Sequence, residues 1–467
     1  MNRTKYLLKN TAIFTLGNLG TKFISFFMVP LYTYWMTTDA YGTVDLIGTI
    51  AGIVVPLLTL NVGEAVLRFA LDKNADVAAI VRIGVAIASV ASVLGLLAIP
   101  ICHVLGFLEQ YAIFISLFIM TGSWQNVCAC ILRGRELLLP YALTSIIQSV
   151  AFAGLAILTM GGLHWGIEGY LIAGVVANCI SLAYSFYAGR VHSYLRWEAI
   201  DTQLMRQMLT FSVVLIPNSF MWWVMNSSDR AMLTAMAGLS VNGIYAVSCK
   251  VPMVFSNLGN LFLQAWQYSA IREDDSADRD EYSSRVFNHV FQLLVLAVAF
   301  AMLVIKPFLR IYVEPSYYEA WRYTPYLFIG VVFLTSASFL SASYTVHKDS
   351  TGFLKSGISG AIVNILLNFA LIPPLGAAGA ALATCLSYLA VFLYRAKDTR
   401  KYIHLRLFTH AQLLGIAVLV IMGTTSFLEN RWEIPLLCSE FLLLCVAYRQ
   451  TLLDFLRVGL GVIHSKR

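Results

Sequence analysis

Residues 77–101, VAAIVRIGVAIASVASVLGLLAIPI, decide the fold, because these 25 positions contain a single charged side chain, Arg82. About 20 consecutive apolar residues allow an α-helix to cross the hydrocarbon core of a bilayer. The segment therefore predicts a transmembrane helix. The whole chain shares this character: 59% of its 467 residues are hydrophobic and 12% are charged, which is about half the charged fraction of an average soluble domain. We expect the bilayer to be its solvent.

Similar apolar segments follow one another along the chain, separated by short connections with turn residues such as Thr38–Gly42. The predicted transmembrane helices are residues 10–36, 43–71, 77–101, 110–132, 137–161, 166–189, 209–236, 240–270, 286–306, 320–346, 353–375, 376–396, 408–428 and 432–456. The longest polar connection, residues 272–285, is too short for a separate folded domain. The sequence therefore predicts an all-α membrane protein with about 14 transmembrane helices.

The basic residues are distributed unevenly between the two predicted faces of the membrane. Of 32 Lys and Arg residues, 25 fall on the side that both termini share, including Arg68 near the cytoplasmic end of its segment, and the other three, Lys22, Arg230 and Lys250, lie deeper inside helices. The opposite side has four, namely Lys306, Arg310, Arg322 and Arg431. Because cytoplasmic loops are enriched in Lys and Arg, we expect a multi-pass protein of the bacterial cytoplasmic (inner) membrane with both termini in the cytoplasm.

Two short motifs occur twice. Ala40-Tyr41-Gly42 is echoed by Val241-Asn242-Gly243, 201 residues later, and Gly166–Gly169 is echoed by Gly376–Gly379, 210 residues later. Six predicted helices lie in each repeat. Since six is an even number, both repeats have the same orientation, and a pseudo-twofold axis along the membrane normal relates them.

The repeat divides the chain into three parts. We predict an N-terminal lobe of six helices in residues 1–200 and a C-terminal lobe of six helices in residues 201–400. Residues 401–467 add two extra transmembrane helices and a cytoplasmic tail. Transporters with repeats of this kind place their substrate site between the two lobes.

Ionisable residues at membrane depth are costly and usually face the interior of a protein, where they often serve function. Four basic and two acidic residues qualify: Lys22, Glu64, Arg68, Asp229, Arg230 and Lys250. The basic ones are spread in depth along the helices. They predict a ladder of positive charge through the membrane.

Polar side chains at helical spacing accompany these charges. In the segment 240–270 the stripe is Lys250, Asn257, Asn260, Gln264 and Gln267, and in the segment 209–236 it is Asn218, Trp222, Asn226 and Asp229. Shorter stripes contain Asn18, Lys22 and Ser25, and Asn61, Glu64 and Arg68. Amides and indoles suit sugar hydroxyls, through hydrogen bonds and stacking on sugar rings. The stripes therefore predict substrate-binding side chains.

Simpler roles compete with this interpretation. Glu64 and Arg68 have the spacing and order of an intrahelical ion pair, and Arg68 could also extend to the cytoplasmic interface. Asp229 and Arg230 are adjacent, so they point about 100° apart, and at least one needs a partner on another helix. Asn and Gln often only hold membrane helices together. Glu64 and Asp229 are also candidates for coupling transport to a proton or sodium gradient.

Several motifs of other protein classes are absent. The sequence has no Walker A motif, no Gly-rich dinucleotide turn and no H-E-x-x-H motif. The eight cysteines have neither zinc spacing nor redox spacing, which indicates small apolar residues. We therefore expect no catalytic residues, no metal, no cofactor and no nucleic-acid partner.

The first half of the chain contains residues that resemble a known family. In order these are Pro30–Thr33, Asp39–Gly42, Gly63 and Arg68-Phe69. They resemble the opening of the Wzx-type flippases of polysaccharide biosynthesis, in the multidrug/oligosaccharidyl-lipid/polysaccharide superfamily. Further blocks resemble the second half of these proteins: Ser228–Arg230, Gly243–Tyr245, Lys250 and Gly376–Thr384.

This resemblance implies a flippase that moves undecaprenyl-pyrophosphate-linked oligosaccharides across the membrane for O-antigen, capsule or exopolysaccharide assembly. The partners it implies are the lipid-linked oligosaccharide, the bilayer, and a polysaccharide polymerase with chain-length proteins. A basic passage would suit a diphosphate, and the prenyl tail could stay in lipid. The alternatives are a cation-coupled multidrug exporter, which favours an acidic cavity, and a membrane polysaccharide polymerase, which has a long outer loop.

Overall fold

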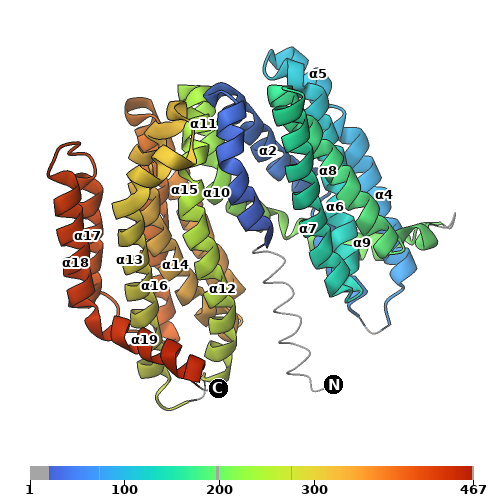
Figure 1. The fold of residues 1–467 in the computed structure, drawn as a ribbon. Helices are drawn as coiled ribbons and strands as arrows, with labels where there is room; N and C mark the ends of the chain where they lie inside the picture. Colours follow the sequence, from blue (N-terminus) through green and yellow to red (C-terminus); the bar gives the residue numbers. More distant parts are fainter. Residues whose placement is uncertain (1–19, 73, 196–198, 275, 465–467) are drawn as a thin grey trace. The chain divides into compact units, whose positions relative to one another are not determined.

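The computed structural model describes residues 20–464 apart from residues 73, 196–198 and 275 (Figure 1). It does not describe the side chains of residue 456 or of residues 458–464. The predicted Asn18 also lies outside the described residues. In the described part of the chain all regular structure is helical, with no β-strand. This confirms the predicted all-α class.

The helices follow one another with short connections. A helix of residues 20–35 comes first. The others in the N-terminal half are α2 (Thr38–Leu58), α3 (Val62–Ala70), α4 (Val77–Gly95), α5 (Ala98–Leu105), η1 (Glu109–Tyr111), α6 (Ala112–Gly134), α7 (Leu138–Ala156), η2 (Ile157–Gly162), α8 (Gly166–Ala188), η3 (Val191–Tyr194) and α9 (Thr202–Val213). They are followed by α10 (Ile216–Ala237), α11 (Leu239–Ser248), α12 (Lys250–Arg272), α13 (Arg279–Tyr312), η4 (Pro315–Arg322), α14 (Thr324–Val346), α15 (Ser350–Leu375), α16 (Ala377–Asp398), η5 (Thr399–Lys401), α17 (His410–Thr425), α18 (Glu433–Ala447) and α19 (Arg449–His464).

The number of spans agrees with the prediction. Ten helical segments among the described residues are long and apolar enough to cross a membrane, and some of them, such as Val77–Leu105 and Thr202–Ala237, join two consecutive helices. The bent pair α18 and α19 forms an eleventh candidate. The other three predicted spans correspond to the helix of residues 20–35, to α11 with α12, and to the shorter α17. The polar stripe of α12 explains why its mean hydropathy is lower than that of the other spans. The chain is therefore a multi-pass membrane protein.

Three predicted spans are broken near a proline. Pro56 precedes the break between α2 and α3, Pro217 lies in the first turn of α10, and Pro252 lies in the first turn of α12. A proline has no N–H for the hydrogen bond to the carbonyl four residues earlier, so the helix is weakened there. At the first break, Leu60 and Asn61 adopt φ values of 49° and 56°, in the left-handed region that non-glycine residues seldom occupy.

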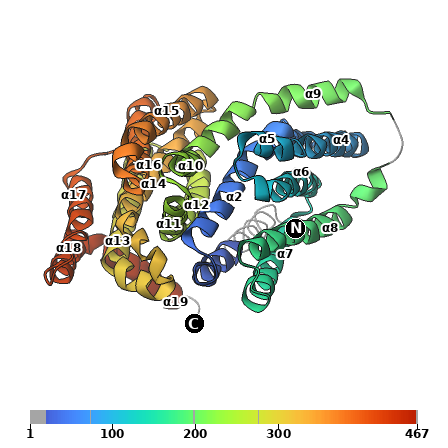
Figure 2. The ribbon, with the colours of Figure 1, turned by 90° about the horizontal axis from the view of Figure 1, so that it is seen from above.

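The chain packs as two compact units, Met1–Trp223 and Val224–Arg467, with the boundary inside α10. In the first unit, α6 contacts α2, α3, α4, α7 and α8. The helices α4, α6, α7 and α8 lie side by side in both views (Figures 1 and 2). Its core includes Val62, Val66, Ile83 and Val127, all fully buried. Burial of such side chains away from both lipid and water holds the helices of this unit in fixed register.

In the second unit, α14 is the most buried of the long helices. It contacts α12, α13, α15, α16 and α17 (Figure 1). Phe328 and Leu340 are almost fully buried in this helix. The pair α15 and α16 corresponds to α7 and α8 of the first unit, since both pairs pack tightly along their length.

The repeated glycine motifs have the same structural role in the two units. Gly166 before α8 and Gly376 before α16 have φ values of 53° and 56°, and glycine adopts this region without strain. Three residues later, a Cβ on Gly169 would lie 3.1 Å from the backbone of Thr159, and one on Gly379 would lie 2.1 Å from the carbonyl oxygen of Leu371. Each motif therefore makes a tight turn and then a close helix–helix contact.

The last helices pack beside α13. Lys306 of α13 forms an ion pair with Glu433 at 2.7 Å, donates to the carbonyl oxygen of Ser426 at 2.7 Å and lies over the ring of Trp321 at 3.8 Å. The predicted helix of residues 432–456 is wrong at its end, because the chain bends by 71° between α18 and α19. The spanning helix ends at Ala447, and α19 runs across the lower end of α13 (Figure 1).

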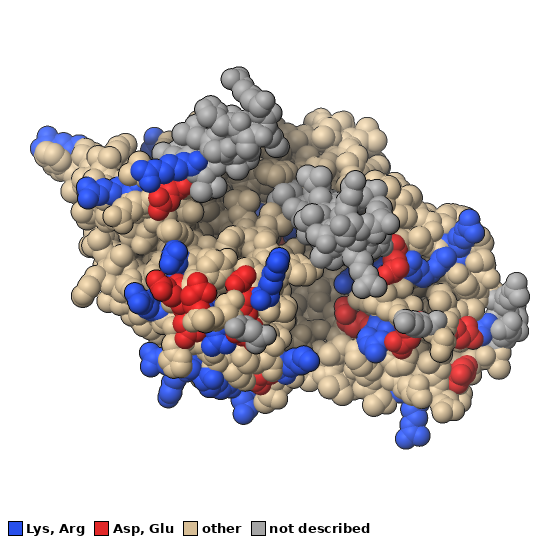
Figure 3. All heavy atoms as spheres, turned by 90° about the horizontal axis from the view of Figure 1, so that it is seen from below, with Lys and Arg blue, Asp and Glu red and all other residues tan. Residues whose placement is uncertain are grey.

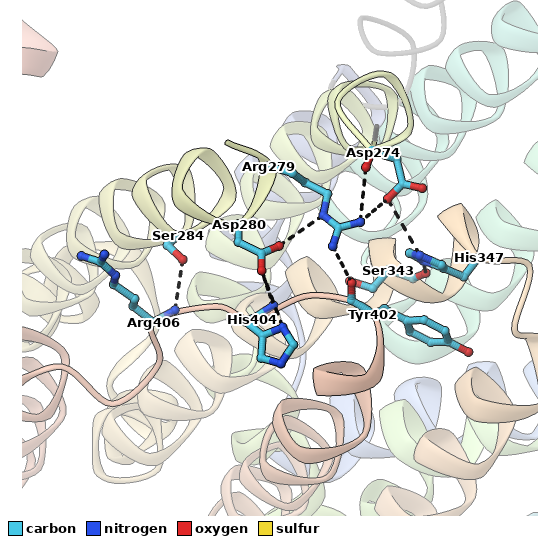
Figure 4. Close-up of polar contacts among 9 residues, drawn as sticks. All are labelled: Asp274, Arg279, Asp280, Ser284, Ser343, His347, Tyr402, His404 and Arg406. Carbon is cyan, nitrogen blue, oxygen red and sulfur yellow. Dashed lines mark hydrogen bonds and ion pairs between the residues drawn. The ribbon is translucent and has the colours of Figure 1, made fainter. Parts of the chain in front are cut away.

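The segment between α16 and α17 is tied to the start of α13 (Figure 4). Arg279 donates to the carbonyl oxygen of Tyr402 at 2.8 Å and pairs with Asp274 at 3.0 Å and with Asp280 at 3.2 Å. The backbone N–H of His404 donates to Asp280 at 3.2 Å. These contacts fix the path by which the chain leaves the second repeat and enters α17.

Candidate functional site

The second unit contains a buried carboxylate, Asp229 of α10, with 5% of its surface exposed. Its Oδ2 atom accepts hydrogen bonds from Tyr245 of α11 at 2.5 Å and from Thr384 of α16 at 3.3 Å. Its Oδ1 atom accepts the backbone N–H of Arg230 at 2.9 Å. The predicted partners on other helices are therefore present for Asp229, and they are hydroxyl groups.

Buried amides and hydroxyls extend this cluster into α15. Ser228 donates to Oδ1 of Asn364 at 3.1 Å, and Asn368 donates to the same oxygen at 3.0 Å. Asn364 in turn approaches Ser387 of α16 at 3.4 Å. Asn364 and Asn368 are almost completely buried. We call Ser228, Asp229, Tyr245, Asn364, Asn368, Thr384 and Ser387 the Asp229 cluster.

The Asp229 cluster combines one carboxylate, bonded to the hydroxyls of Tyr245 and Thr384, with a neighbouring group of amide and hydroxyl oxygens around Asn364. Carboxylate, hydroxyl and amide oxygens are the groups that hard cations prefer, and a carboxylate is also a proton acceptor. The cluster draws on α10, α11, α15 and α16, so a change in the packing of these helices would alter its geometry. It has the chemistry of a cation or proton site.

The first unit contains a cavity of about 410 Å³ between the helix of residues 20–35 and α2, α6, α7 and α8. Its lining includes Lys22, and it includes no acidic side chain among the described residues. Its polar and small lining residues are Thr21, Ser25, Gly48, Ser145, Gln148, Ser149, Gly174 and Asn178. We call this space the N-terminal cavity.

The walls of the N-terminal cavity are held by contacts within the unit. Gln148 donates to Asn178 at 2.5 Å, and Asn178 donates to Thr121 at 3.3 Å. On the aromatic side, the rings of Tyr32, Phe152 and Tyr170 pack edge to face or tilted, with centroids 5.0 to 5.9 Å apart. The cavity therefore has an amide side, an aromatic side and one cation.

The predicted charges of the first unit are exposed. Lys22 lines the N-terminal cavity and forms no ion pair among the described residues. The alternative interpretation, an intrahelical pair of Glu64 with Arg68, is not what the structure shows. Both residues lie on α3, but Arg68 bonds to Asp72, which follows the end of this helix, at 2.6 Å. Glu64 is exposed on α3.

The predicted stripes on α10 and α12 are only partly buried within the structure. Trp222 and Asn226 are exposed on α10, and Arg230 is half-buried beside them. On α12, Asn260 and Gln264 are exposed, whereas Lys250 and Asn257 are half-buried. These side chains lie on helix faces that their own units leave open.

The sequence analysis missed most members of both sites. It did not single out Gln148 and Asn178, nor Tyr245, Asn364, Asn368 and Thr384. A signal existed for Asn364 and Asn368, because two amides four residues apart in an apolar segment lie on one face of a helix. Asp45 of α2 and Arg395 of α16 were also missed as charges inside predicted spans.

Comparison with known proteins identifies the fold. The chain is similar to the lipid II flippase MurJ in an inward closed conformation, with a TM-score of 0.68, 12% identity and coverage of 95% of this chain and 100% of that chain. It is similar to an inward-facing multidrug resistance MATE family transporter of the MOP superfamily, with a TM-score of 0.62, 13% identity and coverage of 83% and 94%. For a Vibrio cholerae MATE transporter the TM-score is 0.57, with 14% identity and coverage of 85% and 97%. These likenesses confirm the predicted fold class.

The sequence comparison identifies the family. No individually curated protein matches the chain. The family described as "Polysaccharide biosynthesis protein" matches residues 7–268, which is more than half of the chain. This match agrees with the predicted resemblance, and the fold is that of a flippase and of related transporters. The chain belongs to the polysaccharide biosynthesis protein family.

Proposed function

We propose that the chain is a flippase that moves a polyprenyl-pyrophosphate-linked oligosaccharide across the bacterial cytoplasmic membrane by alternating access, for the assembly of a surface polysaccharide. The observation that carries this proposal is the sign of charge in the N-terminal cavity, which has Lys22 and no acidic side chain in its described lining. A cation would be repelled there and a pyrophosphate attracted. This supports a lipid-linked sugar over the cationic substrates of a multidrug exporter.

In this proposal Lys22, Arg68, Arg230 and Lys250 bind the pyrophosphate at successive depths. Trp222, Asn226, Asn257, Asn260 and Gln264 contact the sugars. Charge-assisted hydrogen bonds to phosphate are about twice as strong as neutral ones. The helix faces that carry these residues are partly open within their units, which gives a passing substrate access to them.

We also propose that the Asp229 cluster couples transport to a gradient of sodium ions or protons. A buried carboxylate bonded to the hydroxyls of Tyr245 and Thr384 supports this role. Glu64 is the weaker candidate, because it is exposed and has no comparable set of oxygen partners among the described residues.

The orientation in this proposal places both termini in the cytoplasm. The 25-to-4 distribution of Lys and Arg supports it. The face of the molecule seen from below carries many charged side chains of both signs (Figure 3). In intact cells, and in a variant that lacks the native cysteines, single cysteines at Thr38, Leu239 or Glu429 should react with an impermeant thiol reagent from outside. Those at Asp72, at Asp275 (which lies outside the described residues) or at Asp398 should not react.

The test of the function is transport in proteoliposomes. The purified chain is reconstituted with a lipid-linked oligosaccharide, and the sugar that reaches the opposite leaflet is measured with an enzyme or lectin that cannot cross the membrane. We expect transport of the lipid-linked sugar and no export of cationic drugs under the same gradient. Drug export without sugar transport would support the multidrug exporter instead.

A further inference from the structure

We propose that the N-terminal cavity is a binding subsite for a glycosyl phosphate, namely the first sugar of the lipid-linked oligosaccharide with the phosphate joined to it. The inference rests on the proposed function and adds to it the part of the substrate that the first unit recognises. It is argued from the size, the polar groups, the aromatic side and the charge of the cavity.

The size of the N-terminal cavity suits a small part of the substrate. Ligand pockets in proteins usually have volumes of about 300–1,000 Å³, and about 410 Å³ lies near the lower end of this range. Such a space holds one or two rings, and it is too small for a whole oligosaccharide or a long prenyl chain. Only one end of the glycan can therefore enter it.

The amide side of the cavity is built for hydroxyl groups. The bonds from Gln148 to Asn178 and from Asn178 to Thr121 fix both amides. They leave the Gln148 side-chain oxygen without a partner among the described residues, so it can accept a hydrogen bond from a ligand. Ser145 and Ser149, one turn apart on α7, add hydroxyls that donate and accept.

The aromatic side of the cavity offers an apolar surface to the face of a sugar ring. Tyr32, Phe152 and Tyr170 hold one another by edge contacts. Aromatic rings have negative faces, which attract the polarised C–H groups of a pyranose ring. The amide side and the aromatic side lie along the same helices, since Gln148 and Phe152 are one turn apart on α7. A sugar has hydroxyl edges and an apolar face, so it can contact both.

Lys22 adds a requirement for negative charge. An ammonium group serves as a point charge for phosphate oxygens, and no carboxylate in the described lining competes for it. A neutral sugar would leave Lys22 unused, and an inorganic phosphate would leave the amide and aromatic sides unused. A sugar joined to a phosphate uses all three sides.

Gly48 is a position from which an added side chain can enter the cavity. A Cβ at Gly48 of α2 would meet no atom within 4 Å, and Gly48 lines the cavity. Gly154 of α7 also has open space at this position, and it is not part of the lining. Gly48→Phe and Gly154→Phe are therefore the same chemical change inside and outside the proposed subsite.

The experiment measures binding to the full chain in lipid nanodiscs. The ligands are a short-chain polyprenyl pyrophosphate and the same lipid joined to N-acetylglucosamine or to galactose. We expect one sugar-bearing lipid to bind about tenfold more tightly than the bare lipid, from two or three added hydrogen bonds. Gly48→Phe should abolish this gain, so that the sugar-bearing lipids bind no more tightly than the bare lipid. Gly154→Phe and Gly48→Ala should preserve it.

The outcomes separate the subsite from the function. If the bare lipid binds and neither sugar improves its affinity, or if Gly48→Phe preserves the gain, the subsite is wrong although the flippase proposal stands. If none of the three lipids binds, the proposed function fails and the subsite with it. N-acetylglucosamine 1-phosphate and galactose 1-phosphate should bind at least tenfold more weakly than the lipid. Equal affinity would assign the cavity to soluble sugar phosphates and overturn its role toward the lipid-linked substrate.

Discussion

The N-terminal cavity and the Asp229 cluster are built on corresponding helices of the two units, but they have opposite polar chemistry. The helix of residues 20–35 contributes the cation Lys22 to an open cavity, whereas α10 contributes the anion Asp229 to a closed set of hydrogen bonds. A buried polar group must find partners within the protein, and a group that lines a cavity can find them in a ligand. The comparison therefore predicts that changes in the Asp229 cluster affect coupling and stability, and that changes in the N-terminal cavity affect only substrate handling.

The largest effect is expected for Asp229→Asn. The amide can still accept hydrogen bonds from Tyr245 and Thr384, so the fold is retained, but the negative charge that would attract a cation is lost. We expect gradient-driven transport to fall by about a hundredfold, on the order of the loss of a charged hydrogen-bonding group. The measurement is transport in proteoliposomes with and without gradients of sodium ions or protons.

Tyr245→Phe is the matched control for this change. It removes the hydroxyl donor at 2.5 Å and leaves the carboxylate in place. Transport should fall by less than tenfold, and it should still respond to the gradient. If Asp229→Asn also kept a full response to the gradient, the Asp229 cluster would serve only to pack helices together. The proposal that the second unit couples transport to the gradient would then be wrong.

The next largest effect is expected for Lys22→Gln. Loss of one charge-assisted contact costs about 1.5–3 kcal/mol, which corresponds to a ten- to hundredfold weaker affinity for the pyrophosphate lipid. Because Lys22 is exposed, the melting temperature should be unchanged. Lys22→Arg should retain part of the affinity. If Lys22→Gln lowered the melting temperature as much as the substitution of a buried residue does, Lys22 would not be the exposed side chain of an open cavity.

The fold was largely predictable from the sequence because hydropathy alone limits a membrane chain to helices. Fourteen spans and a repeat were expected, and the glycine motifs at Gly166 and Gly376 explain the repeat in physical terms. The break at Leu60 and Asn61 was not predictable, because Leu seldom adopts a left-handed conformation. Asn adopts it more often than most residues, but a single Asn in an apolar segment does not by itself predict a break. The bend before α19 was missed because the apolar residues Leu452, Leu453, Phe455 and Leu456 were assigned to the span, although Arg449, Gln450 and Asp454 interrupt the apolar pattern there.

The candidate sites were predictable only in part. Charges such as Lys22 and Asp229 stand out in apolar segments. Single amides such as Gln148 and Asn178 do not, because an amide in a membrane helix often serves packing alone. Partners far apart in the sequence, such as Asp229 and Thr384, come together only through the packing of α10 against α16. Periodicity within one helix carries no information about such pairs.

A smaller effect, on stability, is expected for Arg395→Met in the second unit. Arg395 is buried, donates to Ser356 and to the carbonyl oxygen of Ala337, each at 2.9 Å, and lies over the ring of Phe353. Its removal leaves buried acceptors without a donor, which costs about 1–3 kcal/mol. Thermal unfolding in detergent measures the change.

Arg68→Met in the first unit is the matched control for Arg395→Met. The pair of Arg68 with Asp72 is exposed on both sides, and exposed ion pairs contribute about 0–1 kcal/mol. The melting temperature should therefore fall for Arg395→Met and stay nearly constant for Arg68→Met. If the melting temperature fell equally in the two variants, the buried charge of Arg395 would contribute no more to stability than the exposed charge of Arg68.

The smallest effect is expected for Asp349. It tests whether a charged side chain at the surface of the second unit is also held by hydrogen bonds within the protein, as Asp229 is in the core. Asp349 accepts the backbone N–H of Gly352 at 2.8 Å at the start of α15, and it also accepts hydrogen bonds from Lys401 at 2.9 Å and from Tyr402 at 2.8 Å. The bond from Gly352, followed by those from Lys401 and Tyr402, lowers the pKa of Asp349 from 3.8 to about 2.

A carboxyl group whose pKa is lower in the folded state stabilises the fold above its unfolded pKa, and this contribution is lost as the pH falls toward the folded value. For Asp349 the window therefore extends from about pH 4 to about pH 2. Asp349→Asn keeps an oxygen for the Gly352 N–H and loses the charge. We expect the variant to melt a little below the wild type at pH 6, and the difference should shrink as the pH falls through this window. If the difference in melting temperature stayed constant down to pH 2, the bonds to Lys401 and Tyr402 would not depend on the charge of Asp349. Hydrogen-bonded charges would then contribute to the stability of this unit only in its buried core.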